Sequence, residues 1–142
     1  MEILIGKGIG NFSFGLSKNE IQLIQGKPDK IYTDDYEDVF VVYNSIKATF
    51  KIESNNKFGW LETSNKDVTI FNISPWSIEQ KELVTKITEI LNETPEVEDY
   101  GSFESITFNK SWLELQFEYG KLKEINLGVL YDENNNTIWP NA

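Results

Sequence analysis

Apolar and polar residues alternate along several stretches of the chain, which is the pattern of strands that bury one face of a sheet. The range 46–53 alternates in this way, and the apolar run V-F-V-V-Y at 39–43 is typical of a buried strand. The clearest alternation covers 112–119, where Leu113, Leu115, Phe117 and Tyr119 lie opposite Trp112, Glu114, Gln116 and Glu118. Further strands are predicted at 2–5, 58–64, 68–73, 105–108 and 122–130.

A helix is predicted between Ser17 and Gly26, because both of its ends carry recognisable signals. The Ser17 hydroxyl can accept a hydrogen bond from a first-turn amide, and Glu20 can reach back to the Ser17 amide to complete a capping box. Gly26 suits the left-handed residue that ends a helix, and Pro28 prevents the helix from continuing.

A second, longer helix is predicted between Ser77 and Pro95. Ser77 is expected to be its N-cap, with Gln80 as the second residue of the capping box. Pro95 is expected to end it, because the residue before a proline is disfavoured in helical conformation. Between these ends lies an apolar stripe at helical spacing, formed by Leu83, Val84, Ile87, Ile90 and Leu91.

The order of these elements occurs twice. In each half, about residues 1–66 and 67–142, a strand is followed by a capped helix, a proline, an acidic segment and three antiparallel strands. We therefore expect a single α+β domain over 1–142, in which two β-α-β-β-β pseudo-repeats form one antiparallel sheet of about eight strands. Both helices are expected to pack on one face of this sheet, which leaves the other face open to solvent or to a partner.

The composition removes most catalytic side chains. The chain has no cysteine and no histidine, so it has neither a thiolate nucleophile nor an imidazole base. Its 13 basic residues are all lysines, so no guanidinium is present to clamp a phosphate. The glycines of G-K-G-I-G at 6–10 match no nucleotide-binding spacing, and D-E-N-N-N at 132–136 lacks the glycine of a calcium loop. We therefore expect a protein that is not an enzyme and has no catalytic residues, cofactor or metal site.

The formal net charge of −10 indicates what the chain can bind. Its sign opposes binding to nucleic acid or to an anionic membrane, and it favours a fast encounter with a basic protein. The start M-E-I-L-I-G-K-G has neither the basic region nor the apolar run of a signal peptide or membrane helix. The sequence therefore predicts a cytoplasmic protein with a basic protein partner.

Two acidic segments at matched positions of the halves are the strongest candidates for a binding site. They are Asp34, Asp35, Tyr36, Glu37 and Asp38 in the first half, and Glu98, Asp99 and Tyr100 in the second. Their carboxylates suit the lysines and arginines of a basic partner, but acidic turns also occur simply as solvated loops. Trp112 is a further candidate, because it lies on the polar face of its strand and tryptophan is a common interface anchor.

The residues G-L-S at 15–17, E-I at 20–21 and I-Q-G-K-P-D at 24–29 resemble a motif of small bacterial helix-plus-meander domains. These domains include outer-membrane assembly lipoproteins of the SmpA/BamE type and the tandem-repeat β-lactamase inhibitor protein. The assembly lipoproteins carry an acylated cysteine that is absent here. The tandem layout is more similar to the inhibitor protein, in which a sheet face and its loops hold another protein, and small acidic immunity proteins look similar.

Taken together, the residues and the resemblance favour a non-enzymatic inhibitor, most simply an immunity protein that neutralises a cognate bacterial toxin such as a basic nuclease. Its acidic segments would then occupy the place of the nucleic-acid substrate. Two alternatives stay open: a small-molecule binding module on the open sheet face, and an assembly or chaperone-like protein of the SmpA/BamE type.

Overall fold

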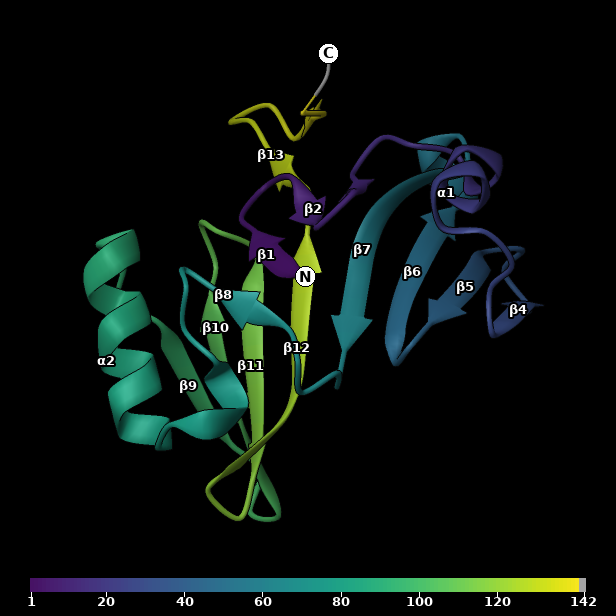
Figure 1. Cartoon of the computed structure of the whole chain (residues 1–142). Coiled ribbons are helices and arrows are strands. Elements are labelled where there is room, and N and C mark those ends of the chain that lie inside the picture. The colour runs from purple at the N-terminus through teal and green to yellow at the C-terminus, as the bar shows by residue number, and fades with distance from the viewer. Residues whose placement is uncertain (141–142) are drawn as a thin grey trace.

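The computed structural model describes residues 1–140 and has an α+β fold with two helices and one large antiparallel sheet (Figure 1). The helices are α1 (Lys18–Gln25) and α2 (Gln80–Leu91). Across the large sheet, the eight strands are β4 (Lys30–Thr33), β5 (Val39–Tyr43), β6 (Ile46–Lys51), β7 (Lys57–Thr63), β12 (Lys121–Gly128), β11 (Leu113–Glu118), β10 (Phe103–Phe108) and β9 (Glu96–Asp99). The expected fold class and the large antiparallel sheet are thus confirmed.

A second, smaller sheet contains both strands that were expected to open the two halves. Its order is β3 (Phe12–Ser13), β2 (Gly8–Ile9), β1 (Glu2–Leu4) and β8 (Thr69–Ile70), with β8 parallel to β1. The expectation that the strands at 2–5 and 68–73 join the large sheet is therefore wrong. The edge positions of the large sheet are occupied by β4 and β9, each of which pairs on one side only. Neither shows an apolar alternation: β9 is exposed along its whole length, and β4 is exposed except at Tyr32.

The two helices begin in different ways. At α1 the expected capping box is present, because Glu20 N donates to Ser17 Oγ and Ser17 N donates to Glu20 Oε1, each at 3.1 Å. At α2 the expected Ser77 cap is wrong, because Ser77 ends a 3₁₀ turn, η2 (Pro75–Ser77), and Glu79 stands at the N-cap position without a side-chain cap bond. The half-buried Ile78 packs against the core with an extended backbone, which separates Ser77 from the helix.

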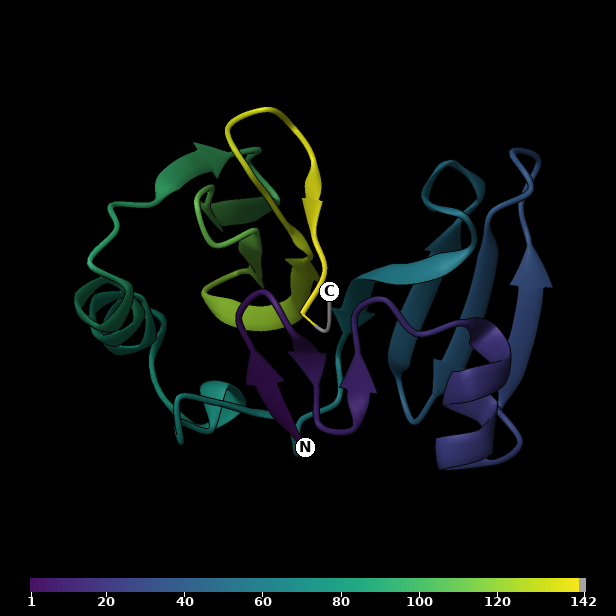
Figure 2. The same ribbon diagram turned by 90° about the horizontal axis from the view of Figure 1, so that it is seen from above.

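The hydrophobic core lies against one face of the large sheet, which we call the helix face. Both helices and the small sheet lie on this side (Figure 2). α1 buries Ile21, and α2 buries Leu83 and Ile87. The predicted stripe of α2 is thus buried in part, since Ile90 stays 51% exposed. Side chains of neighbouring strands line up on this face, for example the fully buried set Ala48, Leu61, Leu127 and Leu113.

The remaining elements lie close to the ends of the long strands. They are a 3₁₀ turn, η1 (Ile52–Ser54), and a hairpin of β13 (Leu130–Tyr131) and β14 (Thr137–Ile138). The hairpin turn is held by Asp132, whose Oδ1 accepts from the backbone amides of Asn134 and Asn136 at 2.9 Å. Neither helix of the described chain has the length and apolar character needed to cross a membrane.

Candidate functional site on the open face of the sheet

The face of the large sheet opposite the helices, which we call the open face, carries a line of polar side chains across its middle. Strand register places Lys47 of β6 beside Glu62 of β7, Glu62 beside Asn126 of β12, and Asn126 beside Glu114 of β11. These four residues alternate with buried apolar residues of the same strands, so the pleat turns them away from the core. We call Lys47, Glu62, Asn126 and Glu114 the polar row.

The polar row is bonded along most of its length. Lys47 Nζ lies 2.7 Å from Glu62 Oε2, and Asn126 Nδ2 donates to Glu114 Oε1 at 2.7 Å. Glu114 also accepts from the Ser105 hydroxyl and from Gln116 Nε2, the latter at 3.2 Å. Asn126 is only 4% exposed, and its Oδ1 is buried without a hydrogen-bond partner among the described residues. Glu114 therefore accepts from three neutral donors, and Asn126 Oδ1 beside it is an acceptor without a donor.

Two tryptophan rings lie over Gly128, the last residue of β12, on the open face. A Cβ atom at Gly128 would lie 2.8 Å from Cε3 of Trp60 and 3.1 Å from Cε3 of Trp112, so only glycine leaves both rings in place. The Trp112 ring also packs on Tyr131, with 5.0 Å between ring centroids. Trp112 lies in the turn before β11 and stays 43% exposed.

The tryptophans and Glu114 enclose a cavity of about 300 Å³, which we call the tryptophan cavity. This volume is at the lower end of the ~300–1,000 Å³ range of small-molecule sites. The residues that line it are Trp60, Thr107, Asn109, Trp112, Leu113 and Glu114. Two tryptophan side chains, one from β7 and one from the turn before β11, and one carboxylate therefore converge on one hollow of the open face.

The backbone around Trp112 is fixed from both sides. Trp112 has a left-handed φ of 51°, which is costly for a bulky residue, and its carbonyl accepts from Gly128 N at 2.9 Å. The turn that precedes it is tied to Glu93 after α2, which accepts from Lys110 N at 2.7 Å and from Ser111 Oγ at 2.9 Å. One wall of the cavity is thus positioned by a carboxylate on the helix side.

Burial and neighbouring charge shift the pKa values of two residues on the open face. Burial raises the pKa of Glu124, which lies beside Gln116 in the register, and the negative charge of Glu62 raises it further. Burial lowers the pKa of Lys47, but its ion pair with Glu62 outweighs this effect, and the pKa lies above the ordinary value. Negative charge is therefore in excess near the middle of the open face.

The raised pKa of Glu124 gives a testable pH dependence. The folded chain holds the Glu124 proton more tightly than the unfolded chain does. The contribution of Glu124 to the free energy of unfolding is therefore fully present below the unfolded pKa of about 4.3, and it is lost as the pH rises through the folded pKa. We expect Glu124→Gln to raise the midpoint temperature at pH 7 modestly and to leave it unchanged at acidic pH. Thermal unfolding followed by circular dichroism across pH checks this. Glu96→Gln on the exposed edge strand β9 is the control, and an equal gain in both variants would contradict the assignment.

The two acidic segments predicted from the sequence lie far apart. Asp34–Asp38 form the turn between β4 and β5, whereas Glu98 and Asp99 end β9 and Tyr100 starts the turn to β10. β4 and β9 are the opposite edges of the sheet, and because all neighbouring strands are antiparallel, β4 and β9 run in opposite directions. The segments therefore stand at diagonal corners and do not form one site.

Several carboxylates of these segments are used locally. Asp34 Oδ1 accepts from the amides of Tyr36 and Asp38 at 3.0 Å, and Asp38 Oδ1 accepts from Ile52 N at 3.1 Å. In the second segment, Asp99 Oδ1 accepts from Gly101 N at 2.8 Å, and Glu98 accepts from the Tyr100 hydroxyl. The exposed charges of the first turn are those of Asp35 and Glu37.

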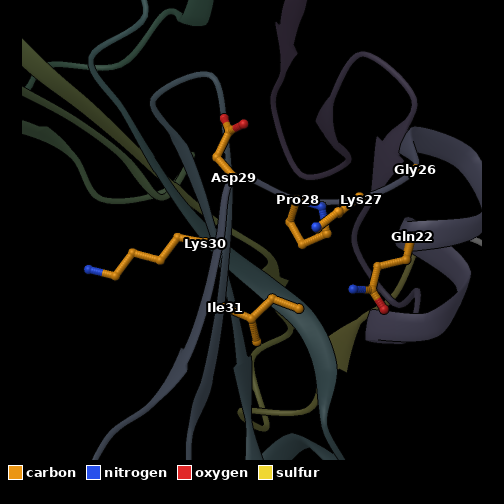
Figure 3. A pocket seen from close by; sticks show the side chains of 7 residues that line it. All are labelled: Gln22, Gly26, Lys27, Pro28, Asp29, Lys30 and Ile31. Atoms are coloured by element: carbon orange, nitrogen blue, oxygen red, sulfur yellow. The ribbon is translucent and has the colours of Figure 1, made fainter.

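A second hollow lies between the end of α1 and β4 and measures about 510 Å³ (Figure 3). Its walls include Pro28, Ile31 and the backbone of Gly26, while the Lys30 side chain points away from it (Figure 3). The Gly26 carbonyl already accepts from the Tyr43 hydroxyl at 2.6 Å, and Asp29 Oδ2 accepts from Asn44 N at 2.8 Å. These two groups hold the chain in place, and Gln22 and Lys27 are further polar side chains that line the hollow.

Sequence reasoning found part of the open face. The alternation in 112–119 placed Trp112 and Glu114 together; in the structure Glu114 lies in β11 and Trp112 in the turn before it, and both line the tryptophan cavity. It missed Asn126, which sits between the buried Ile125 and Leu127 in a strand that was identified by its apolar residues alone. Among the described residues, no group of histidine, cysteine or carboxylate side chains has the arrangement of a metal site.

Comparison with known proteins gives little beyond these observations. No protein-family model and no curated protein matches the chain. Among solved structures, the chain is similar to an extracellular protein containing an SCP domain from Bacillus anthracis str. Ames, with 9% sequence identity and a TM-score of 0.49. The match covers 81% of this chain and 43% of that one, so this chain spans less than half the length of its neighbour. A likeness at this level carries no argument about function.

Proposed function

We propose that the chain is a non-enzymatic inhibitor that binds a basic protein, and that it acts as an immunity protein against a cognate bacterial toxin in the cytoplasm. The observation that carries this proposal is the chemistry of the open face. On its four middle strands, this face carries Glu62, Glu114, Glu118 and Glu124. Glu62 is paired with Lys47 and Glu118 with Lys123, whereas Glu114 and Glu124 take part in none of the ion pairs of the described residues. This excess of negative charge lies beside the exposed Trp112, and such a combination suits a basic partner with an apolar contact.

The order of the strands supports a tandem arrangement of this face. On each side of the β7–β12 pair, a helix is followed along the chain by four antiparallel strands, and the last strand of each set lies at the centre. We propose that the two halves are pseudo-repeats with the unit α-β-β-β-β in place of the expected β-α-β-β-β. A repeat of this kind produces a wide sheet with one uncovered face, which can contact a large area of another protein.

The net charge of −10 supports the choice of a basic toxin, with a nuclease as the simplest example. A nuclease carries lysines and arginines where it binds phosphates, and carboxylates of the open face would compete for those side chains. Asp35 and Glu37 at one corner of the sheet would accelerate the encounter through long-range attraction, because they are exposed and not used by the turn.

Co-expression with the product of the adjacent open reading frame tests the proposal. We expect that product to arrest growth when it is expressed alone, and we expect this chain to restore growth and to co-purify with it. In binding kinetics with the purified pair, Trp112→Ala should raise the dissociation rate about tenfold or more, as expected for an interface anchor. Glu37→Lys should slow association and weaken its salt dependence, whereas Glu89→Lys on α2 makes the same charge change on the helix side and should not.

A neighbouring product that is harmless, or a toxic one that the chain neither binds nor neutralises, would contradict the proposed function. If the complex forms but Trp112→Ala dissociates like the unmodified chain, the open face is not the interface.

A further inference from the structure

The tryptophan cavity has a charge that nothing in the described chain neutralises. Glu114 takes part in none of the ion pairs formed by the described residues, and its three hydrogen-bond donors, on Ser105, Gln116 and Asn126, are neutral. The nearest lysine along the polar row, Lys47, is paired with Glu62 at 2.7 Å. A carboxylate has about four acceptor sites, so Glu114 keeps the capacity for a further donor.

An independent feature beside Glu114 also points to a missing donor. Asn126 Oδ1 is buried without a partner among residues 1–140, although the Nδ2 of the same amide lies 2.7 Å from Glu114. Buried polar atoms are rarely left unpaired in native structures. The alternation of β12 turns Asn126 toward the open face, where its amide lies directly beside Glu114, although Asn126 itself does not line the cavity.

The walls of the cavity add a preference for a cation. Trp60 and Trp112 line it, and the electron-rich face of tryptophan attracts ammonium and guanidinium groups more strongly than other aromatic faces do. A guanidinium has five N–H donors in a planar fork, which allows stacking on a ring and bonding to a carboxylate at the same time. Phosphate or another anion is disfavoured by the nearby charges of Glu62, Glu114 and Glu124.

From these features we infer that the tryptophan cavity receives one basic side chain of the partner protein, preferably an arginine, between the tryptophan faces and the Glu114 carboxylate. This inference rests on the proposed function, since it names the group through which the partner is recognised. Arginine is preferred over lysine because its fork can bond the carboxylate and stack at once, whereas an ammonium acts as a point charge.

The experiment uses the isolated chain and a small probe, Nα-acetyl-L-arginine N-methylamide, at constant ionic strength. The two-dimensional ¹H–¹⁵N NMR spectrum is recorded during titration, and the indole N–H signals of Trp60 and Trp112 are followed. We expect a saturable shift of both signals with the arginine probe and none with the citrulline analogue, which has nearly the same shape but no charge. Glu114→Gln should weaken binding of the probe about tenfold, as expected for the loss of a charge-assisted hydrogen bond.

Two further variants keep the test decisive if Glu114→Gln fails to fold. Glu96→Gln removes a carboxylate from the edge strand β9 and should bind the probe like the unmodified chain. Trp112→Ala removes one cavity wall at a partly exposed position, and it should abolish the shift of Trp60 even if Glu114→Gln is unstable. Signal dispersion in the same spectra shows whether each variant is folded.

Three results would overturn the inference. Equal binding of arginine and citrulline probes would make the cavity a site for neutral polar molecules. A shift that persists unchanged in Glu114→Gln would place the probe elsewhere, and the absence of any saturable shift would leave the cavity without this ligand. Because no partner protein is present in the assay, these results are independent of whether the chain neutralises a toxin.

Discussion

Phe58→Ala is expected to lower the free energy of unfolding by about 3–5 kcal/mol, the usual cost of removing a fully buried phenylalanine side chain. Phe58 is 0% exposed in β7, and its ring packs on Phe14 and Phe50 with centroid distances of 4.8 and 5.9 Å. Its backbone also receives the N-terminal segment, because Gly15 N donates to its carbonyl and its amide donates to Leu16 O, each at 2.8 Å. The cavity left by the ring would therefore lie where the small sheet and the large sheet meet.

Urea unfolding at pH 7, followed by circular dichroism, measures this effect. The matched control is Phe103→Ala, which removes the same atoms from a half-buried position where the ring stacks on the exposed Tyr100. That change should cost less, because part of the ring is already in contact with water and its removal leaves no enclosed cavity. Since the free energy of unfolding of native domains is only about 5–15 kcal/mol, Phe58→Ala would remove a large part of it. Similar losses in both variants would contradict the place of Phe58 in the fully buried core.

The parts of the fold that were predictable from the sequence are those in which local chemistry and burial agree. The capping box of Ser17 and Glu20 needs only residues three apart, and it is present as expected. The strands that bury one face, such as β6 and β11, display their alternation directly in the sequence. These signals identify elements reliably because each is written in a few neighbouring residues.

The edge strands and the second helix start were not predictable in the same way. β9 consists of E-V-E-D and is exposed throughout, so no apolar face reveals it, and its charges are those that protect an edge from pairing with another chain. Ser77 has the chemistry of a cap, but the packing of Ile78 on the core moves the helix start beyond it. In both cases contacts with distant residues decide the outcome.

The candidate site depends even more on long-range order. Trp60 and Trp112 are distant along the chain, and the pairing of β12 with both β7 and β11 brings them together above Gly128. The same strand order separates the two acidic segments, although their repetition in the sequence suggested a shared role. Residue types thus indicated a protein with acidic and aromatic binding groups, and strand order determined which of those groups are neighbours.

Gly128→Ala is expected to destabilise the chain by about 1–3 kcal/mol, the usual cost of an extra methyl group in a tightly packed position. The new Cβ would lie 2.8 Å from Cε3 and 2.9 Å from Cζ3 of Trp60, so the rings of Trp60 and Trp112 must move. Because both rings line the tryptophan cavity, the change should also shift their indole N–H signals and reduce the shift that the arginine probe produces.

Gly59→Ala is the matched control for this prediction, because Gly59 lies in the neighbouring strand β7 and its added Cβ would make ordinary contacts of 3.6 Å or more. It should leave stability within about 1 kcal/mol of the unmodified chain, in either direction, since a compatible alanine restricts the unfolded state. Urea unfolding of both variants and their indole spectra check the pair of predictions.

A double-mutant cycle separates the steric explanation from a general weakening of β12. If the methyl group at Gly128 acts by displacing the Trp60 ring, then Gly128→Ala should cost much less when Trp60 is already Val, because the clashing atoms are absent. Equal costs in the two backgrounds would mean that the alanine disturbs the strand itself. In that case, the absence of a side chain at Gly128 would be needed for the backbone of β12, and not for the placement of the two tryptophan rings over it.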